Sequence, residues 1–280
     1  DLIDASPTEE LDSVKSEDFV PVVEACTLCD MCFMTKCPYV PPHEWNIDFP
    51  HLMLRARMAE VKAGKSNWTA GQLARMDRNG RLAGAVAPLA NWASKKSNRP
   101  VRAVMEKTLG IDRDAELPKF HARTFVKRAK KAKRALNTAA PAYGKRKAAI
   151  FATCFVNYNK PPIGEAALAV LDKIGVETLV EYPGCCGMPF LEQADLARVA
   201  AQAKDVSAKL RPLIDAGYDI ITPTASCGLM FKFEWPLIVP DDPNVKALSQ
   251  AAFDIDEYVV DVARKHGLPE GLKPIEGGVS

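Results

Sequence analysis

The stretch ETLVEYPGCCGMP, residues 177–189, joins a short apolar run to two adjacent cysteines, Cys185 and Cys186. Its first six residues, 177–182, are rich in residues that favour extended structure, and they predict a strand. Glycines on both sides of the cysteine pair permit backbone conformations closed to other residues and a close approach to a bulky group. This junction predicts a ligand site directly after the carboxyl end of a strand.

Alternating strand and helix patterns continue on both sides of this stretch. Further short apolar runs predict strands at 148–153, 218–224 and 237–239. Longer helical patterns predict helices at 164–175, 193–217, 227–235 and 253–267. Strands that alternate with helices over connections of this length indicate an α/β fold with a mostly parallel sheet and covering helices.

Cysteines follow three of the predicted strands. Cys154 comes after the first strand, Cys185 and Cys186 come after the second, and Cys227 comes after the third. Because the carboxyl ends of parallel strands share one edge, where open α/β folds place their ligands, these four thiols are expected to meet in one crevice. The set suits an iron–sulfur cluster and zinc alike. Two other interpretations stay open: ordinary core cysteines, and a redox-active disulfide of the adjacent pair.

A second group of cysteines lies near the beginning of the chain, in CTLCDMCFMTKCP, residues 26–38. The spacing of Cys26, Cys29, Cys32 and Cys37 is close to the ferredoxin run C-x2-C-x2-C-x3-C-P, with one more residue in the last gap. A four-cysteine zinc site usually has two C-x2-C pairs a dozen or more residues apart. The run therefore predicts a 4Fe-4S cluster. Cys37 either completes this cluster or ligates a second one.

The composition excludes several classes of protein. The chain has 280 residues, of which 48% are hydrophobic and 26% are charged, as in an ordinary globular protein. Eight clustered cysteines do not resemble a disulfide-stapled secreted scaffold. No apolar run approaches the roughly 20 residues that span a bilayer. A reducing, cytoplasmic setting is expected, and a chain that begins at Asp1 is expected to be a piece of a longer protein.

The middle of the chain is strongly basic. Residues 92–147 carry 17 Lys and Arg against 4 Asp and Glu, and 120–137 predicts a long basic helix. No nucleic-acid motif accompanies these charges, so no nucleic acid is expected to bind. No G-x-G-x-x-G or P-loop run is present, so no flavin or NAD is expected on this chain. A solvated face is the first interpretation, followed by docking to an acidic redox partner or an anionic membrane.

The stretches ATCFVNYNKPPIGEAA, YPGCCGMP and FEWPLI carry a family resemblance. They resemble the cysteine-rich CCG domain of heterodisulfide reductase, which also occurs in lactate utilisation proteins and in the iron–sulfur subunit of anaerobic glycerol-3-phosphate dehydrogenase. A ferredoxin module ahead of a CCG domain is the layout of the last group. The resemblance implies three parts: a ferredoxin-type 4Fe-4S module at 1–60, a basic helical linker at 61–146 and a CCG domain at 147–280.

The resemblance also implies a function, an iron–sulfur electron-transfer subunit of an oxidoreductase. A flavoprotein dehydrogenase, of the glycerol-3-phosphate type, would supply electrons and oxidise the substrate, and quinone or a disulfide would accept them. Peripheral contact with the inner face of the cell membrane is a further expectation. A second ferredoxin-type run would lie upstream and a second CCG domain downstream.

One position departs from the family pattern. The pattern ends C-x-x-C, but Met230 stands at the last place, so zinc stays an alternative to a 4Fe-4S cluster at Cys154, Cys185, Cys186 and Cys227. Two other functions therefore stay open. One is a binding or assembly protein with structural zinc at this site, and the other is a thiol–disulfide reductase that works through the Cys185–Cys186 pair.

Overall fold

Four parallel strands form the sheet in the described part of the chain, in the order β2-β1-β3-β4. The structure is a computed structural model that describes residues 2–35 and 37–272. The strands are β1 (Lys147–Phe151), β2 (Glu177–Glu181), β3 (Asp219–Thr222) and β4 (Ala252–Asp254). The register pairs Lys147 with Glu177, Ala148 with Asp219, and Ile220 with Ala252. The predicted α/β fold with a parallel sheet is confirmed.

Helices cover both faces of the sheet. Ala149, Phe151 and Ile220 point to one face, whereas Ala148, Ile150 and Ile221 point to the other. This alternation is the two-residue period of a strand that is buried on both sides. On the first face lie α12 (Leu196–Asp215), a π-helical turn η3 (Met230–Glu234), α14 (Trp235–Ile238) and α15 (Pro243–Ala251). On the second face lie α8 (Phe125–Ala129), α10 (Pro161–Lys173) and α16 (Ile255–His266).

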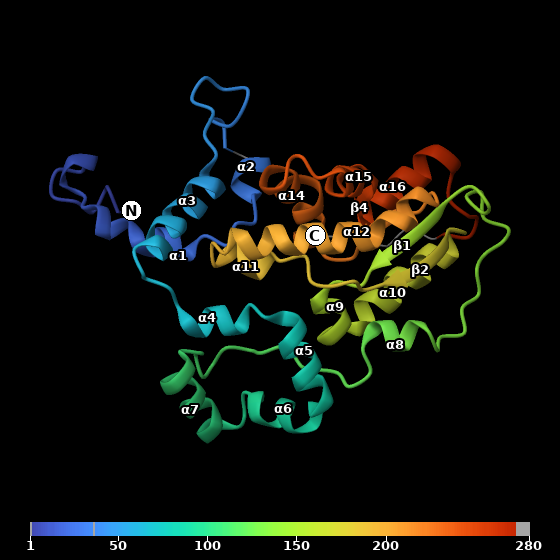
Figure 1. The fold of residues 1–280 in the computed structure, drawn as a ribbon, viewed down its shortest axis with the longest axis horizontal. Coiled ribbons are helices and arrows are strands. Elements are labelled where there is room, and N and C mark those ends of the chain that lie inside the picture. The colour runs from blue at the N-terminus through green and yellow to red at the C-terminus, as the bar shows by residue number, and fades with distance from the viewer. Residues whose placement is uncertain (1, 36, 273–280) are drawn as a thin grey trace.

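The N-terminal segment packs onto the first of these faces. Met53 and Leu54 belong to the same buried apolar cluster as Trp235, and so do Val23 and Leu28. The segment contains two 3-10 turns and three helices, which are η1 (Leu11–Ser13), η2 (Ser16–Phe19), α1 (Val20–Ala25), α2 (Met31–Thr35) and α3 (Phe49–Lys62). Figure 1 shows α3 and α1 beside the end of α12, next to α11 (Met188–Glu192). The first cysteine run is thus held against the sheet-containing part of the molecule.

The middle of the chain forms a separate group of helices, which lies below the sheet in Figure 1. These helices are α4 (Trp68–Leu73), α5 (Met76–Ala85), α6 (Ala87–Ser94) and α7 (Arg99–Leu109). Arg102 is fully buried there, and its guanidinium donates to the carbonyl oxygens of Asp112 at 2.6 Å and Ala115 at 2.8 Å. Part of the basic character of this region is therefore structural rather than a solvated face.

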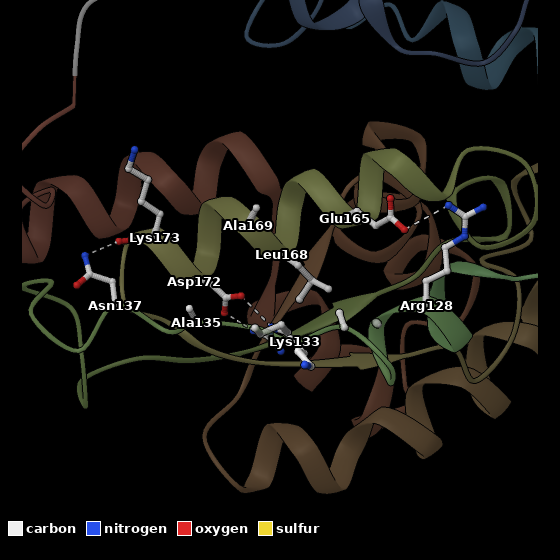
Figure 2. Close-up of a pocket in the computed structure, with 12 residues that line it drawn as sticks. Arg128, Lys133, Ala135, Asn137, Glu165, Leu168, Ala169, Asp172 and Lys173 are labelled. Carbon is white, nitrogen blue, oxygen red and sulfur yellow. Dashed lines mark hydrogen bonds and ion pairs between the residues drawn. The ribbon is translucent and has the colours of Figure 1, made fainter.

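The predicted long basic helix over 120–137 is wrong. Only Phe125–Ala129 is helical, and the chain beyond it runs along α10 (Figure 2). Arg134 donates to both carboxylate oxygens of Asp172 and to the carbonyl of Thr178. Asn137 bonds to the last turn of α10 through its backbone N–H. These tertiary anchors outweigh the helix propensity of an Ala- and Lys-rich segment. The groove of about 530 Å³ drawn in Figure 2 lies between these two segments and contains no cysteine.

The predicted strand at 237–239 is also wrong. Leu237 and Ile238 lie in α14, and the fourth strand is Ala252–Asp254 instead. Three apolar residues are too few for periodicity to separate a strand from a helix. The sequence does hold a signal for the true boundary, because Asp254 and Glu257 form a capping box at the start of α16.

Among the described residues, none of the helices combines the length and the apolar character that a membrane span requires.

Candidate functional site

Four cysteines lie at the carboxyl edge of the sheet. Cys154 opens α9 (Cys154–Tyr158) after β1, and Cys227 lies in α13 (Ala225–Leu229) after β3. Cys185 and Cys186 follow β2. All four side chains are buried, with at most 8% of any one exposed, and none forms a disulfide. Short loops after three neighbouring parallel strands thus bring residues far apart in the sequence to one place.

The four thiols form two close pairs. The sulfur atoms of Cys154 and Cys185 lie 3.7 Å apart, and those of Cys186 and Cys227 lie 3.1 Å apart. The adjacent residues Cys185 and Cys186 therefore link the two pairs. The indole N–H of Trp235 donates to the carbonyl of Cys186 at 3.1 Å and fixes this turn from the core side.

Hydrogen bonds shift the pKa values of these thiols in opposite directions. The hydrogen bond shared with Cys154, a second with Cys186 and the backbone N–H of Gly187 hold the pKa of Cys185 well below its usual range. The pKa values of Cys154 and Cys186 are raised by the same hydrogen bonds and by burial. Gly187 has a φ of +87°, and a Cβ there would meet Gln202 at 2.8 Å, so this N–H can be presented only by glycine.

The donor set fits an iron–sulfur group. Buried thiols, an N–H directed at a sulfur and apolar surroundings are the features by which proteins hold such groups and adjust their potentials. Within residues 2–35 and 37–272, no three His, Cys, Asp or Glu side chains are arranged to hold a single metal ion. Cys154, Cys186 and Cys227 instead open onto a cavity of about 910 Å³.

Met230 occupies the place of the family's last cysteine. It is fully buried in the apolar cluster that also holds Cys186 and Cys227, and it begins the π-helical turn η3. π-Helical turns are often found at functional sites. Met230 does not line the cavity. The structure thus gives it a packing role beside the thiols.

The first cysteine run reaches the same cavity through one of its residues, Cys29. Cys26 follows α1, Cys29 lies in the turn before α2, Cys32 lies in α2, and Cys37 follows it. Cys29 and Cys32 are exposed, whereas Cys26 and Cys37 are half-buried. Cys29 lines the same cavity as Cys154, Cys186 and Cys227. The structure therefore brings the two cysteine sets to one shared space without merging them.

The backbone of this run is tightly turned. Leu28 and Asp30 both have positive φ values, 52° and 56°, which is uncommon for residues other than glycine. The backbone N–H of Met31 and the hydroxyl of Thr27 bond to Cys29 and lower the pKa of its thiol. Burial raises the pKa of Cys32, and the neighbouring thiols of Cys26 and Cys29 add to this rise.

Helix α3 ties the first cysteine run to the sheet-containing part. The guanidinium of Arg57 donates to the carbonyl oxygens of Val23 at 2.7 Å and Cys26 on one side, and of Glu192 at 3.1 Å on the other. At the other end of the helix, Nε2 of His51 lies 3.3 Å from the buried carboxylate of Glu234.

His51 is also paired within its own segment. Its Nδ1 lies 2.6 Å from Asp48. The Glu234 contact comes first among the interactions that raise the pKa of His51 to about 9. Asp30, in the turn of the cysteine run, faces this network, and burial raises its pKa to about 6. His51 thus links the N-terminal segment to the π-helical turn η3.

Sequence reasoning missed Asp77. This residue belongs to α5, in the part predicted as a linker, yet its carboxylate accepts a hydrogen bond from the backbone N–H of Cys185 at 3.1 Å. Its other oxygen accepts from the hydroxyl of Tyr182. No local pattern marks this aspartate, because its partners lie 108 and 105 positions away.

Comparison with known families identifies the second cysteine set. Residues 148–232 match the cysteine-rich domain family CCG. This chain carries a CCG domain. The match spans Cys154, Cys185, Cys186 and Cys227, so the resemblance to the CCG family is confirmed.

Curated relatives support the same assignment. Lactate utilization protein A of Bacillus pumilus (strain SAFR-032) is 30% identical over 131 residues, which are 44% of this chain and 52% of that protein. One of the subunits of the anaerobic glycerol-3-phosphate dehydrogenase of Escherichia coli (strain K12) is 28% identical over 172 residues, 61% of this chain and 42% of that protein. The chain spans about half the length of the curated relatives it matches. No solved structure matches the chain.

Proposed function

We propose that this CCG-domain chain is an iron–sulfur electron-transfer subunit of an oxidoreductase. The observation that carries the proposal is the shared cavity of about 910 Å³, which Cys29 lines together with Cys154, Cys186 and Cys227. A relay between two centres requires that they lie close together, and Cys29 brings the first thiol set to the cavity that three cysteines of the second set line.

Each thiol set has a defined task in this proposal. Cys154, Cys185, Cys186 and Cys227 hold one 4Fe-4S cluster, and the ferredoxin-type run 26–37 supplies the ligands of another. An iron–sulfur cluster supplies reversible one-electron chemistry when it is bound. The chain's own residues bury the four CCG thiols and direct the N–H of Gly187 at the sulfur of Cys185.

Helix α3 sets the spacing between the two thiol sets. Arg57 bonds to the carbonyls of Cys26 and Glu192, and His51 bonds to Glu234. These contacts hold the first cysteine run against α11 and the π-helical turn η3. A guanidinium that donates to several carbonyls at once has few alternative arrangements, so it holds the two segments in one geometry.

The partners are proposed from the relatives. One relative is named as a component of anaerobic glycerol-3-phosphate dehydrogenase. By analogy, a flavoprotein dehydrogenase, of that type, supplies electrons to this chain, and quinone or a disulfide accepts them. Peripheral contact with a membrane surface belongs to the same proposal.

A thiol–disulfide reductase is the second candidate. The sulfurs of Cys186 and Cys227 lie 3.1 Å apart, and the pKa of Cys185 is lowered. These two features suit thiol exchange, because a thiolate is the attacking species in that reaction. The electron-transfer proposal also accounts for the shared cavity, whereas a thiol–disulfide reductase would not require it.

Two matched substitutions test the proposal. Protein purified without oxygen is reduced with a viologen donor and followed by electron paramagnetic resonance. Cys29→Ser is expected to remove the signal of the N-terminal centre and keep that of the CCG centre, and Cys186→Ser is expected to do the reverse. If Cys186→Ser keeps the signals of both centres, the relay is contradicted. Activity that survives in metal-free protein and disappears on alkylation would establish the thiol–disulfide reductase instead.

A further inference from the structure

Helix α5 lies directly over the CCG thiols. Met76 packs against the small apolar cluster of Cys154, Tyr158 and Cys185. The approach is so close that a Cβ on Gly80 would meet the ring of Tyr158 at 2.4 Å. The segment predicted as a linker is therefore part of the wall around the site.

Asp77 is the charged group on this wall. One carboxylate oxygen accepts from the backbone N–H of Cys185 at 3.1 Å, and the other accepts from the hydroxyl of Tyr182. Burial raises the pKa of Asp77, and these two hydrogen bonds oppose the rise. An ionised carboxylate is acceptor-only, so these two donated hydrogen bonds stabilise the ionised form of Asp77.

The positive charge of Arg81, on the same helix, acts on Asp77 without forming a salt bridge with it. Among the described residues, no Lys, Arg or His side chain forms a salt bridge with Asp77. A negative charge without an ion-pair partner thus lies next to a cysteine of the site.

Two physical effects of this carboxylate act in the same direction. A fixed negative charge disfavours the addition of an electron to a group nearby, and the effect is larger where water is excluded. The carboxylate also engages the backbone N–H of Cys185, so this donor is not available to a sulfur. Hydrogen bonds to sulfur and net charge are the two principal means by which proteins shift the potential of an iron–sulfur group.

We propose that Asp77 is a positioning residue that holds the main chain at Cys185 and, through its charge, lowers the reduction potential of the CCG centre. This inference rests on the proposed function, since it requires a redox-active centre at these thiols. It assigns a role in the chemistry to α5, which neither the cysteine pattern nor the CCG match at 148–232 includes.

Substitution of Asp77 separates its charge from its hydrogen bonds. Asp77→Asn keeps an oxygen that accepts from Cys185 N–H but removes the charge, and Tyr182→Phe removes one hydrogen bond but keeps the charge. Asp215→Asn is the control, because Asp215 ends α12 just before the amino end of β3, at the opposite edge of the sheet. Iron content, the paramagnetic resonance spectrum and a redox titration are measured for each protein.

The expected result is a higher potential in Asp77→Asn at unchanged iron content. An increase of about tenfold in the equilibrium constant for reduction is expected, which is about 59 mV for a one-electron couple. No rise is expected in Tyr182→Phe, which keeps the charge, and none in Asp215→Asn.

An unchanged potential in Asp77→Asn, with normal iron content, overturns the inference and leaves the proposed function standing. A wild-type protein without a redox-active centre at the CCG thiols overturns both. If Asp77→Asn does not retain iron, Asp77→Glu decides: a potential equal to that of wild type supports the role of the charge, and a raised potential or loss of iron there overturns it.

Discussion

The sulfur atoms of Cys186 and Cys227 lie 3.1 Å apart, although the two residues are 41 positions apart in the sequence. A disulfide bond needs a separation of about 2.05 Å, so a shift of roughly 1 Å would join them. We expect mild oxidation of metal-free protein to link Cys186 to Cys227 in preference to Cys154 and Cys185, whose sulfurs lie 3.7 Å apart. Peptide mapping by mass spectrometry detects the link. A bond between the adjacent Cys185 and Cys186 as the main product would contradict this geometry.

The contact of His51 with Glu234 predicts a dependence of stability on pH. The pKa of His51 is raised from 6.5 to about 9, first by Glu234 and also by Asp48. A raised pKa means that the contribution of His51 is complete below pH 6.5 and is lost as the pH rises through about 9. We expect the free energy of unfolding to fall over this range, and to fall less in His51→Gln.

Asp30 also faces this contact, and the pH range of the prediction lies above its pKa. Asp30 has a pKa raised to about 6, so its own titration is nearly complete before that of His51 begins. Asp48 and Glu234 are the remaining acids around His51. Chemical denaturation at several pH values provides the measurement. Equal pH dependence in wild type and His51→Gln would show that the contact contributes nothing.

The guanidinium of Arg57 predicts a local loss of order when it is removed. Arg57→Ala leaves the carbonyls of Val23, Cys26 and Glu192 without their donor. We expect a loss of about 1.5–3 kcal/mol, as is typical of hydrogen bonds to charged groups, and faster amide exchange over residues 20–35. The exposed Arg55 lies on the same helix, and Arg55→Ala is the matched control. Equal exchange in the two variants would contradict the role given to Arg57.

The close approach of α5 to α9 predicts opposite effects for two glycines. Gly80→Ala places a Cβ at 2.4 Å from the ring of Tyr158, and overpacking of this kind costs about 1–3 kcal/mol. Gly71 in α4 has no atom within 4 Å of its added Cβ, so Gly71→Ala is expected to stabilise the helix by up to about 1 kcal/mol. Denaturant titrations compare the two. Stabilisation by Gly80→Ala would mean that α5 does not pack on α9 in this way.

The sequence predicts the sheet and the place of its thiols because both depend on local patterns. β1, β2 and β3 are apolar runs between helical patterns, and a cysteine follows each one, so their common edge can be inferred. β4 was missed because its three residues are too few to show a period.

The parts that were not predicted depend on contacts between distant residues. Arg134 binds Asp172, 38 positions later, and this keeps the chain after 129 out of a helix. Asp77 accepts a hydrogen bond from the backbone of Cys185, 108 positions later, and no residue pattern near Asp77 predicts this contact. Contacts between residues so far apart in the sequence can be recognised only in the folded chain. The roles of the eight cysteines as ligands, and the division of the chain at 60 and 146, stay predictions.

The central claim is that the two cysteine sets each hold an iron–sulfur cluster. The most direct measurement is iron, acid-labile sulfide and zinc per chain in protein purified without oxygen, with paramagnetic resonance spectra before and after reduction. Two 4Fe-4S clusters would give about 8 iron atoms, about 8 sulfides and no zinc, with two reducible centres. About 4 iron atoms with one zinc, and a single reducible centre, would contradict it and would make the CCG site structural.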